Sequence, residues 1–146
     1  MQVSGVFLAF GVGKTLCVKS VSAADRVRAI SLGLPGVTEV VSHGAPCFFV
    51  DGNRPICYFH DHHGGDDRVT IWCPAPPGVA EVLADADPAR FFRPKQSKSG
   101  VFAGWLGVVL EPTPAGGVDW DEMAAILVEA FRMVAPRRLI TQLNRF

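Results

Sequence analysis

The sequence has no excess of charge of either sign, because 14 lysine and arginine residues balance 14 aspartate and glutamate residues. This balance removes the simplest argument for nucleic-acid binding, since affinity for phosphates comes largely from clustered lysine and arginine. A local basic patch stays open. No apolar run approaches the roughly 20 residues that a membrane-spanning helix needs. The apolar run from Val3 to Val12 lacks the preceding basic residues of a secretory signal, and we expect a cytoplasmic protein.

The spacing of the cysteines excludes two common motifs. Cys17, Cys47, Cys57 and Cys73 form no C-x-x-C pair, so the spacing supports neither a zinc ribbon nor a thioredoxin-type site. Cysteine outside such motifs behaves as a small hydrophobic residue that is frequently buried. We therefore interpret these residues as buried, unreactive thiols.

The first residues lack the glycine that would complete a nucleotide-binding motif. Gly13-Lys14-Thr15 resembles the end of a P-loop, but Leu8 stands where that motif requires a glycine. Without it, the tight turn that lets backbone N–H groups surround a phosphate is not specified. We expect residues 1–21 to form an N-terminal extension, strand-like or poorly ordered, and we expect no cofactor.

Residues 22–146 have the length and composition of one globular domain. Hydrophobic residues make up 49% of the chain, which suffices for a core without disulfides, and there is no internal repeat. Ser22 and Asp25 form a start like a capping box for a helix over Ala23–Leu32. Apolar spacing predicts a second helix over Gly78–Ala86.

The last predicted helix has the strongest signals at both ends. Asp119 and Glu122 provide an acidic start, which suits the positive end of a helix. Apolar residues then recur at helical spacing as far as Val134. Pro136 ends the helix, and Arg137-Arg138 lies where cations favour the last carbonyl groups.

Short strands account for most of the remaining chain. Asp51-Gly52 supplies the positive φ angles of a tight hairpin turn between two of them. Five segments have the pattern of strands: 46–50, 56–60, 68–73, 91–93 and 104–110. The segment 68–73 alternates, which predicts Ile71 on one face of the sheet and Trp72 on the other. With the helices they give the order α-β-β-β-α-β-β-α. This order predicts an α+β fold with helices on one face of an antiparallel sheet.

Several motifs in this order resemble one family. They are L-P-G-V-T-E at 34–39, H-G-A-P-C-F-F-V at 43–50, W-C-P-A-P-P-G at 72–78, D-P-A-R-F-F at 87–92, G-W-L-G-V at 104–108, D-W-D-E at 119–122 and V-A-P-R-R-L at 134–139. Together they are similar to the MmcQ/YjbR-like family. The resemblance implies a two-layer α+β domain with a five-stranded antiparallel sheet and no known catalytic residues. Members are commonly described as DNA-binding, by analogy with a double-wing arrangement of hairpins.

DNA binding through such wings would require basic residues in the hairpin loops, because arginine and lysine contact phosphates and base edges. The candidate contacts are Arg54, His62, His63, Arg68, Arg93, Lys95 and Lys98. Asp61, Asp66 and Asp67 oppose this interpretation, since they lie among the same loop residues and repel phosphate.

Metal binding and catalysis have weaker support. The run His60–His63 with Asp66 and Asp67 contains metal-ligating side chains but no recognised ligand spacing, and we predict no metal site. A thiol–imidazole pair is conceivable for Cys47 with His43 or for Cys73 with His60. Neither spacing is diagnostic, and we predict that the protein is not an enzyme.

The alternative to DNA binding is an interaction module for a protein partner, a second copy or a small ligand. Aromatic residues exceed what one face of a small sheet needs: Phe48, Phe49, Tyr58, Phe59, Trp72, Phe91, Phe92, Phe102, Trp105 and Trp120. At least half of them are expected in the core. The others are expected to line an exposed aromatic face of the sheet.

Overall fold

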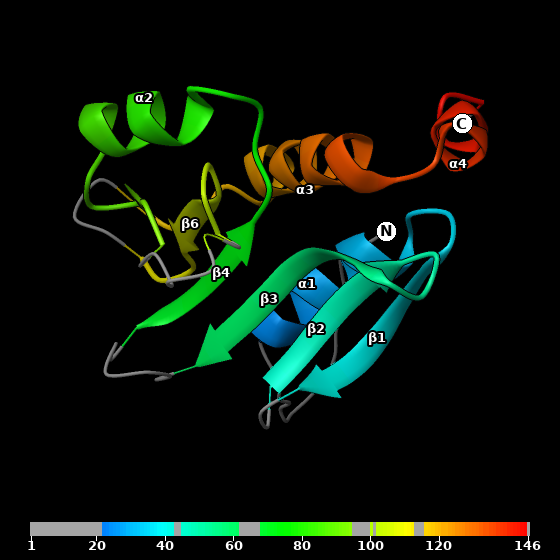
Figure 1. Ribbon diagram of the computed structural model, residues 1–146. Coiled ribbons are helices and arrows are strands. Elements are labelled where there is room, and N and C mark those ends of the chain that lie inside the picture. The colour runs from blue at the N-terminus through cyan, green and yellow to red at the C-terminus, as the bar shows by residue number, and fades with distance from the viewer. Residues whose placement is uncertain are drawn as a thin grey trace, which may run out of the picture.

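The computed structural model describes residues 22–42, 45–61, 68–94, 100, 102–112 and 116–145, which form short strands and helices (Figure 1). The elements of this part of the chain are α1 (Ala23–Leu32), β1 (Val37–Ser42), β2 (Ala45–Val50), β3 (Arg54–Asp61), β4 (Val69–Cys73), α2 (Val79–Ala86), β5 (Phe91–Phe92), β6 (Leu106–Val109), α3 (Trp120–Val134) and α4 (Arg137–Leu143). The predicted extension at residues 1–21 lies outside the described residues. None of the described helices is long and apolar enough to cross a membrane.

The strands form one antiparallel sheet in the order β1-β2-β3-β4-β6-β5. The α+β class is therefore confirmed, but the described sheet has six strands rather than the predicted five. The additional strand is β1, where Val40 and Val41 interrupt the apolar–polar alternation that marks a half-buried strand. Residues 37–42 form a strand because they pair with β2, where Val37 lies opposite Val50.

The helix starts agree with the capping signals in the sequence. The Ser22 hydroxyl accepts a hydrogen bond from the Asp25 N–H at 3.1 Å, and α1 covers the predicted residues. The Asp119 carboxylate accepts one from the Glu122 N–H, also at 3.1 Å, at the start of α3. Each side chain satisfies one of the backbone donors that a helix leaves unpaired in its first turn.

The prediction for Arg137 and Arg138 was wrong. Pro136 does end α3, but the chain then enters a further helix, α4, and both arginines lie in its first turn. Arg138 donates to the Asp51 carboxylate in the β2–β3 turn at 2.7 Å. The predicted tight turn is present, with φ of 56° at Asp51 and 79° at Gly52.

The two faces of the sheet have different neighbours. Helices α1 and α3 cover one face, which we call the helical face, and α1 lies behind β2 and β3 in Figure 1. Phe48, Cys57 and Ile71 point into this layer and have no exposed surface. Because strand side chains alternate, Tyr58 and Trp72, which follow Cys57 and Ile71 in their strands, point to the opposite face.

Candidate functional site

The face opposite the helices carries an aromatic cluster, defined here as Phe49, Tyr58, His60, Trp72, Phe102 and Trp105. Strand register brings its centre together, since Tyr58 of β3 lies directly opposite Trp72 of β4. His60 follows Tyr58 at the spacing of one strand period and therefore shares its face. The sequence pattern correctly assigned Trp72 to the face opposite Ile71.

A turn before β6 supplies the next two rings. Phe102 and Trp105 are joined across this turn, where the Trp105 N–H donates to the Phe102 carbonyl at 3.1 Å. Gly104 has φ of 78°, a left-handed conformation that suits glycine. This geometry folds the turn over the sheet and brings both rings against Tyr58.

The rings pack in the two arrangements that aromatic quadrupoles favour. Trp105 stacks on Tyr58, with centroids 5.7 Å apart and planes at 22°. Phe102 lies edge-on to Trp72 at 5.0 Å and to Trp105 at 5.1 Å. Phe49 meets Tyr58 edge-on at 6.2 Å on the side of β2. Each such pair contributes about 0.5–1.5 kcal/mol beyond the hydrophobic energy of its buried area. These contacts hold the rings in fixed positions relative to one another.

The aromatic cluster is partly exposed, unlike the phenylalanines of the core. All six of its residues are only partly buried, whereas Phe48, Phe59 and Phe91 are buried. Burial and the nearby Cys47 raise the pKa of Tyr58, so its hydroxyl stays neutral at physiological pH. The cluster therefore combines partly exposed rings with the neutral hydroxyl of Tyr58.

Arg68 lies at one border of this face. Its guanidinium carbon is 4.9 Å from the centroid of the Phe92 ring, within the range of a cation–π contact. The Phe92 ring lies over Gly107, where a β-carbon would approach ring atoms to 2.3 Å. Gly107 is directly opposite Trp72 in the sheet. The absence of a side chain at Gly107 thus lets Phe92, and with it Arg68, lie beside the cluster.

Arg54 lies at another border. Its guanidinium donates to the carbonyl oxygen of Val134, in the last turn of α3, at 3.0 Å. A cation is favourable there because the helix ends in unpaired carbonyl groups. Arg54 also lines a pocket of about 290 Å³ whose other wall includes Trp105 and Met133. The pocket therefore connects this arginine with the aromatic cluster.

Of the five other residues predicted to contact DNA, the structure describes only Arg93. Arg93 is exposed just after β5. His62, His63, Lys95 and Lys98 lie outside the described residues. Sequence reasoning identified Arg54 and Arg68 as cations of the hairpin loops, but it did not connect them with the aromatic residues. Only the surplus of aromatic residues signalled the cluster.

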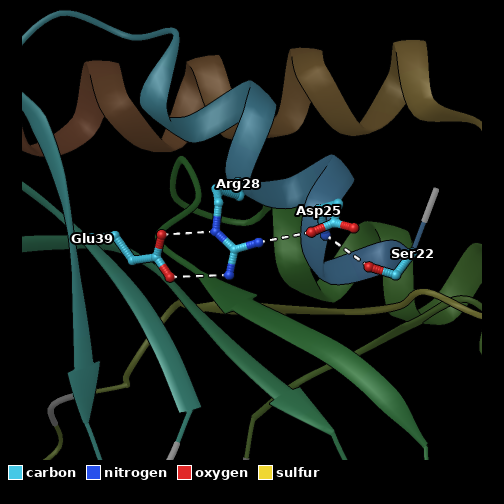
Figure 2. Close-up of polar contacts among 4 residues, drawn as sticks. All are labelled: Ser22, Asp25, Arg28 and Glu39. Atoms are coloured by element: carbon cyan, nitrogen blue, oxygen red, sulfur yellow. Dashed lines mark hydrogen bonds and ion pairs between the residues drawn. The ribbon is translucent and has the colours of Figure 1, made fainter.

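Several other arginines are engaged in ion pairs within the described chain. Figure 2 shows Arg28 of α1 in a two-pronged contact with Glu39 of β1, at 2.8 and 3.1 Å, and in a third contact with Asp25. The hydrogen bonds from Arg28 lower the pKa of Glu39. Further pairs are Arg90 with Glu122 and Asp87, Arg132 with Glu129, and Arg138 with Asp51.

Of the two thiol–imidazole pairs considered from the sequence, the described structure tests only Cys73 with His60, and it keeps these two residues apart. Cys73 points to the helical face and His60 to the opposite face, so the sheet separates them. Burial raises the pKa of Cys73 to about 12 and also raises that of Cys57, which keeps both thiols protonated. His43 lies outside the described residues. No group of three metal-ligating side chains occurs among the residues described.

These features define a class: a small α+β domain with helices on one face of an antiparallel sheet and an aromatic surface on the other. The chain belongs to the YjbR family, whose model matches residues 32–133. Its fold is similar to that of protein DR2400 of Deinococcus radiodurans, a crystal structure described as a DUF419 domain, with a TM-score of 0.60. The two are 18% identical, and the match covers 78% of this chain and 79% of DR2400. No curated protein matches the sequence.

Proposed function

We propose that this domain is a non-catalytic nucleic-acid-binding protein that holds an unpaired stretch of DNA on its aromatic face. The observation that carries the proposal is the partly exposed aromatic cluster bordered by Arg54 and Arg68. Proteins that bind single strands combine aromatic rings, on which bases stack, with cations that contact the backbone. Both components lie here on one surface.

The chemistry assigns a role to each component. Trp105 and Phe102 come from the turn before β6 and are partly exposed, so we assign them the stacking of bases. Stacking of one base on an aromatic side chain contributes about 1–3 kcal/mol. Arg54 and Arg68 then contact the phosphates at either side of the stacked bases, since guanidinium binds phosphate through paired donors.

The charges of the β2–β3 hairpin support an unpaired strand over a duplex. A wing that enters a duplex groove presents cations at its tip, but this tip contains Asp51, which pairs with Arg138. Arg28, Arg90 and Arg132 are also paired with carboxylates. Because few cations remain to contact phosphates, most of the binding energy must come from contacts with the bases. Bases are accessible for such contacts in a single strand.

The test is fluorescence anisotropy with labelled single-stranded and double-stranded DNA of one sequence over a series of salt concentrations. We expect tighter binding of the single strand and a shallow slope of log affinity against log salt, about −1.4 for two phosphates. Arg54→Gln or Arg68→Gln should each reduce that slope by about 0.7. Arg145→Gln, an exposed arginine near the end of α4, is the matched control.

The aromatic contribution is tested separately. Phe102→Ala and Trp105→Ala should weaken binding about 5- to 150-fold, with the slope against salt unchanged. A duplex preference would contradict the single-strand geometry. No binding even at low salt, where the electrostatic contribution is largest, would exclude nucleic acid altogether.

A second candidate function is recognition of a small anionic ligand. It is favoured by the pocket between Arg54 and Trp105, whose volume of about 290 Å³ suits a compact molecule. A planar anion there would stack on the indole and pair with the guanidinium. A mononucleotide that binds as tightly as the oligonucleotide in the same assay would favour this function over strand binding.

A further inference from the structure

The outer edge of β1 is the longest free sheet edge in the described structure. Strand order places β1 at one end of the sheet and β5 at the other, and β5 has only 2 residues against 6 in β1. An edge strand pairs on one side only, so alternate N–H and C=O groups along β1 point away from β2. Such a row of unpaired groups is a template for another strand.

The sequence of β1 lacks the usual protection of an edge. Natural edges are guarded by proline, lysine, bulges or charges, but β1 reads Val-Thr-Glu-Val-Val-Ser. Four of these residues are β-branched, which favours extended pairing. Val40 is 46% exposed and Val41 is 71% exposed, so both faces of the strand carry apolar side chains in contact with water.

The one charge of β1 does not guard the edge. Glu39 is turned toward α1, where Arg28 holds both of its carboxylate oxygens (Figure 2). Its charge is therefore neutralised within the molecule, and it is 25% exposed. A strand that approaches β1 in the plane of the sheet meets no uncompensated charge from this residue.

We propose that β1 pairs antiparallel with β1 of a second copy of this chain and thereby joins two sheets. A second copy fits this edge because the edge is complementary to itself: its exposed apolar side chain can face its own equivalent across a two-fold axis, and its one charged residue is already paired with Arg28. A two-fold axis at Val41 places the Val41 side chains of the two copies, each 71% exposed, directly opposite each other. It also keeps Glu39 away from its own copy, which avoids repulsion between like charges.

The dimer would have a defined arrangement. A two-fold axis perpendicular to a continuous sheet keeps equivalent faces on the same side. Both aromatic faces would therefore lie on one side of the joined sheet, and all the helices on the other. A single strand pair buries little area, and interfaces below about 1,200 Å² are typical of weak association. We therefore expect a dimer that forms only at elevated protein concentration.

The experiment is sedimentation velocity of the full chain, without nucleic acid, over a wide range of concentrations. The wild type should shift from monomer to dimer, and Val41→Lys should stay monomeric throughout because it places like charges together at the axis. Val82→Lys is the matched control, since Val82 is 65% exposed on α2, which packs on β5 and β6 at the end of the sheet opposite β1. Circular dichroism melting of both variants confirms that they fold.

Hydrogen exchange locates the contact. Amide protection in residues 38–42 that rises with protein concentration supports strand pairing. A wild type that stays monomeric at millimolar concentration, or a Val41→Lys variant that still dimerises, would overturn the proposal. Protection at every concentration of the β1 amides that point away from β2 would also overturn it, because another part of the same chain would then cover the edge.

Discussion

The Phe92 ring lies over Gly107 so closely that a β-carbon on the glycine would come within 2.3 Å of ring atoms. One residue without a side chain in β6 thus determines where an aromatic ring of β5 rests. The same ring carries Arg68 at 4.9 Å, so the contact also positions a cation at the border of the aromatic cluster. The relationship connects the packing of the sheet with the candidate site.

Gly107→Ala should destabilise the domain by about 1–3 kcal/mol, because the added methyl group displaces the Phe92 ring. Urea denaturation measures the change in the free energy of unfolding. Gly117→Ala is the control, since a β-carbon there meets nothing within 4 Å. In a Phe92→Ala background the same substitution at Gly107 should cost much less, and additive effects of the two changes would contradict the proposed contact.

Glu39→Gln should lower stability near pH 7 by about 0.5–1 kcal/mol, since the pair with Arg28 lies at a partly exposed position. The folded-state pKa of Glu39 is below its ordinary value of 4.5, so its ionised form stabilises the fold above that value. The contribution is lost as pH falls from 4.5 through the lower folded-state pKa. Denaturation curves of both proteins should therefore converge in acid, and a constant difference at every pH would argue against the ion pair.

The buried thiols should be unreactive in the folded protein. The pKa of Cys73 is raised from 9.0 to about 12 by burial, so almost no thiolate forms at pH 8. In a Cys17→Ser variant, a thiol reagent such as DTNB should label no cysteine until denaturant is added. Rapid labelling of the native variant would show that one of the three remaining thiols is accessible.

The raised pKa of Cys73 should also make the stability of the fold depend on pH in alkaline solution. Because the unfolded chain loses the Cys73 proton near pH 9.0 and the folded chain retains it to about 12, stability should fall through that interval. Cys73→Ala should reduce this dependence of unfolding free energy on pH. The measurement is denaturation at pH 8, 9 and 10, with the wild type beside the variant.

Asp119→Ala should destabilise the domain by about 0.5–2 kcal/mol, because it removes the side chain that accepts from the Glu122 N–H at the start of α3. Asp121→Ala is the matched control, an exposed acidic residue in the same turn without that bond. Equal effects of the two substitutions in thermal unfolding would mean that charge, rather than the cap, is responsible.

Local signals in the sequence were sufficient for much of the fold. Ser22 and Asp119 specify their helix starts through hydrogen bonds to residues three positions along the chain. The turn at Asp51-Gly52 is likewise specified by the conformations that two adjacent residues accept. These features depend on neighbouring residues alone, so they can be predicted before any tertiary contact is known.

The tertiary structure decided β1, α4 and the candidate site. Val40 and Val41 interrupt the alternation that marks a half-buried strand, and β1 is recognised only through its pairing with β2. Arg54 reaches a carbonyl group 80 residues away in the chain. The aromatic cluster joins separate segments through the pairing of β3, β4 and β6.

The composition alone therefore determined that aromatic residues exceed the needs of a core, and local patterns determined which face of β4 carries Trp72. The grouping of these rings into one surface, with Arg54 and Arg68 at its borders, followed only from strand order and register. The physical reason is that contacts between distant segments depend on which strands become neighbours, and strand neighbours are chosen by the packing of the whole sheet against its helices.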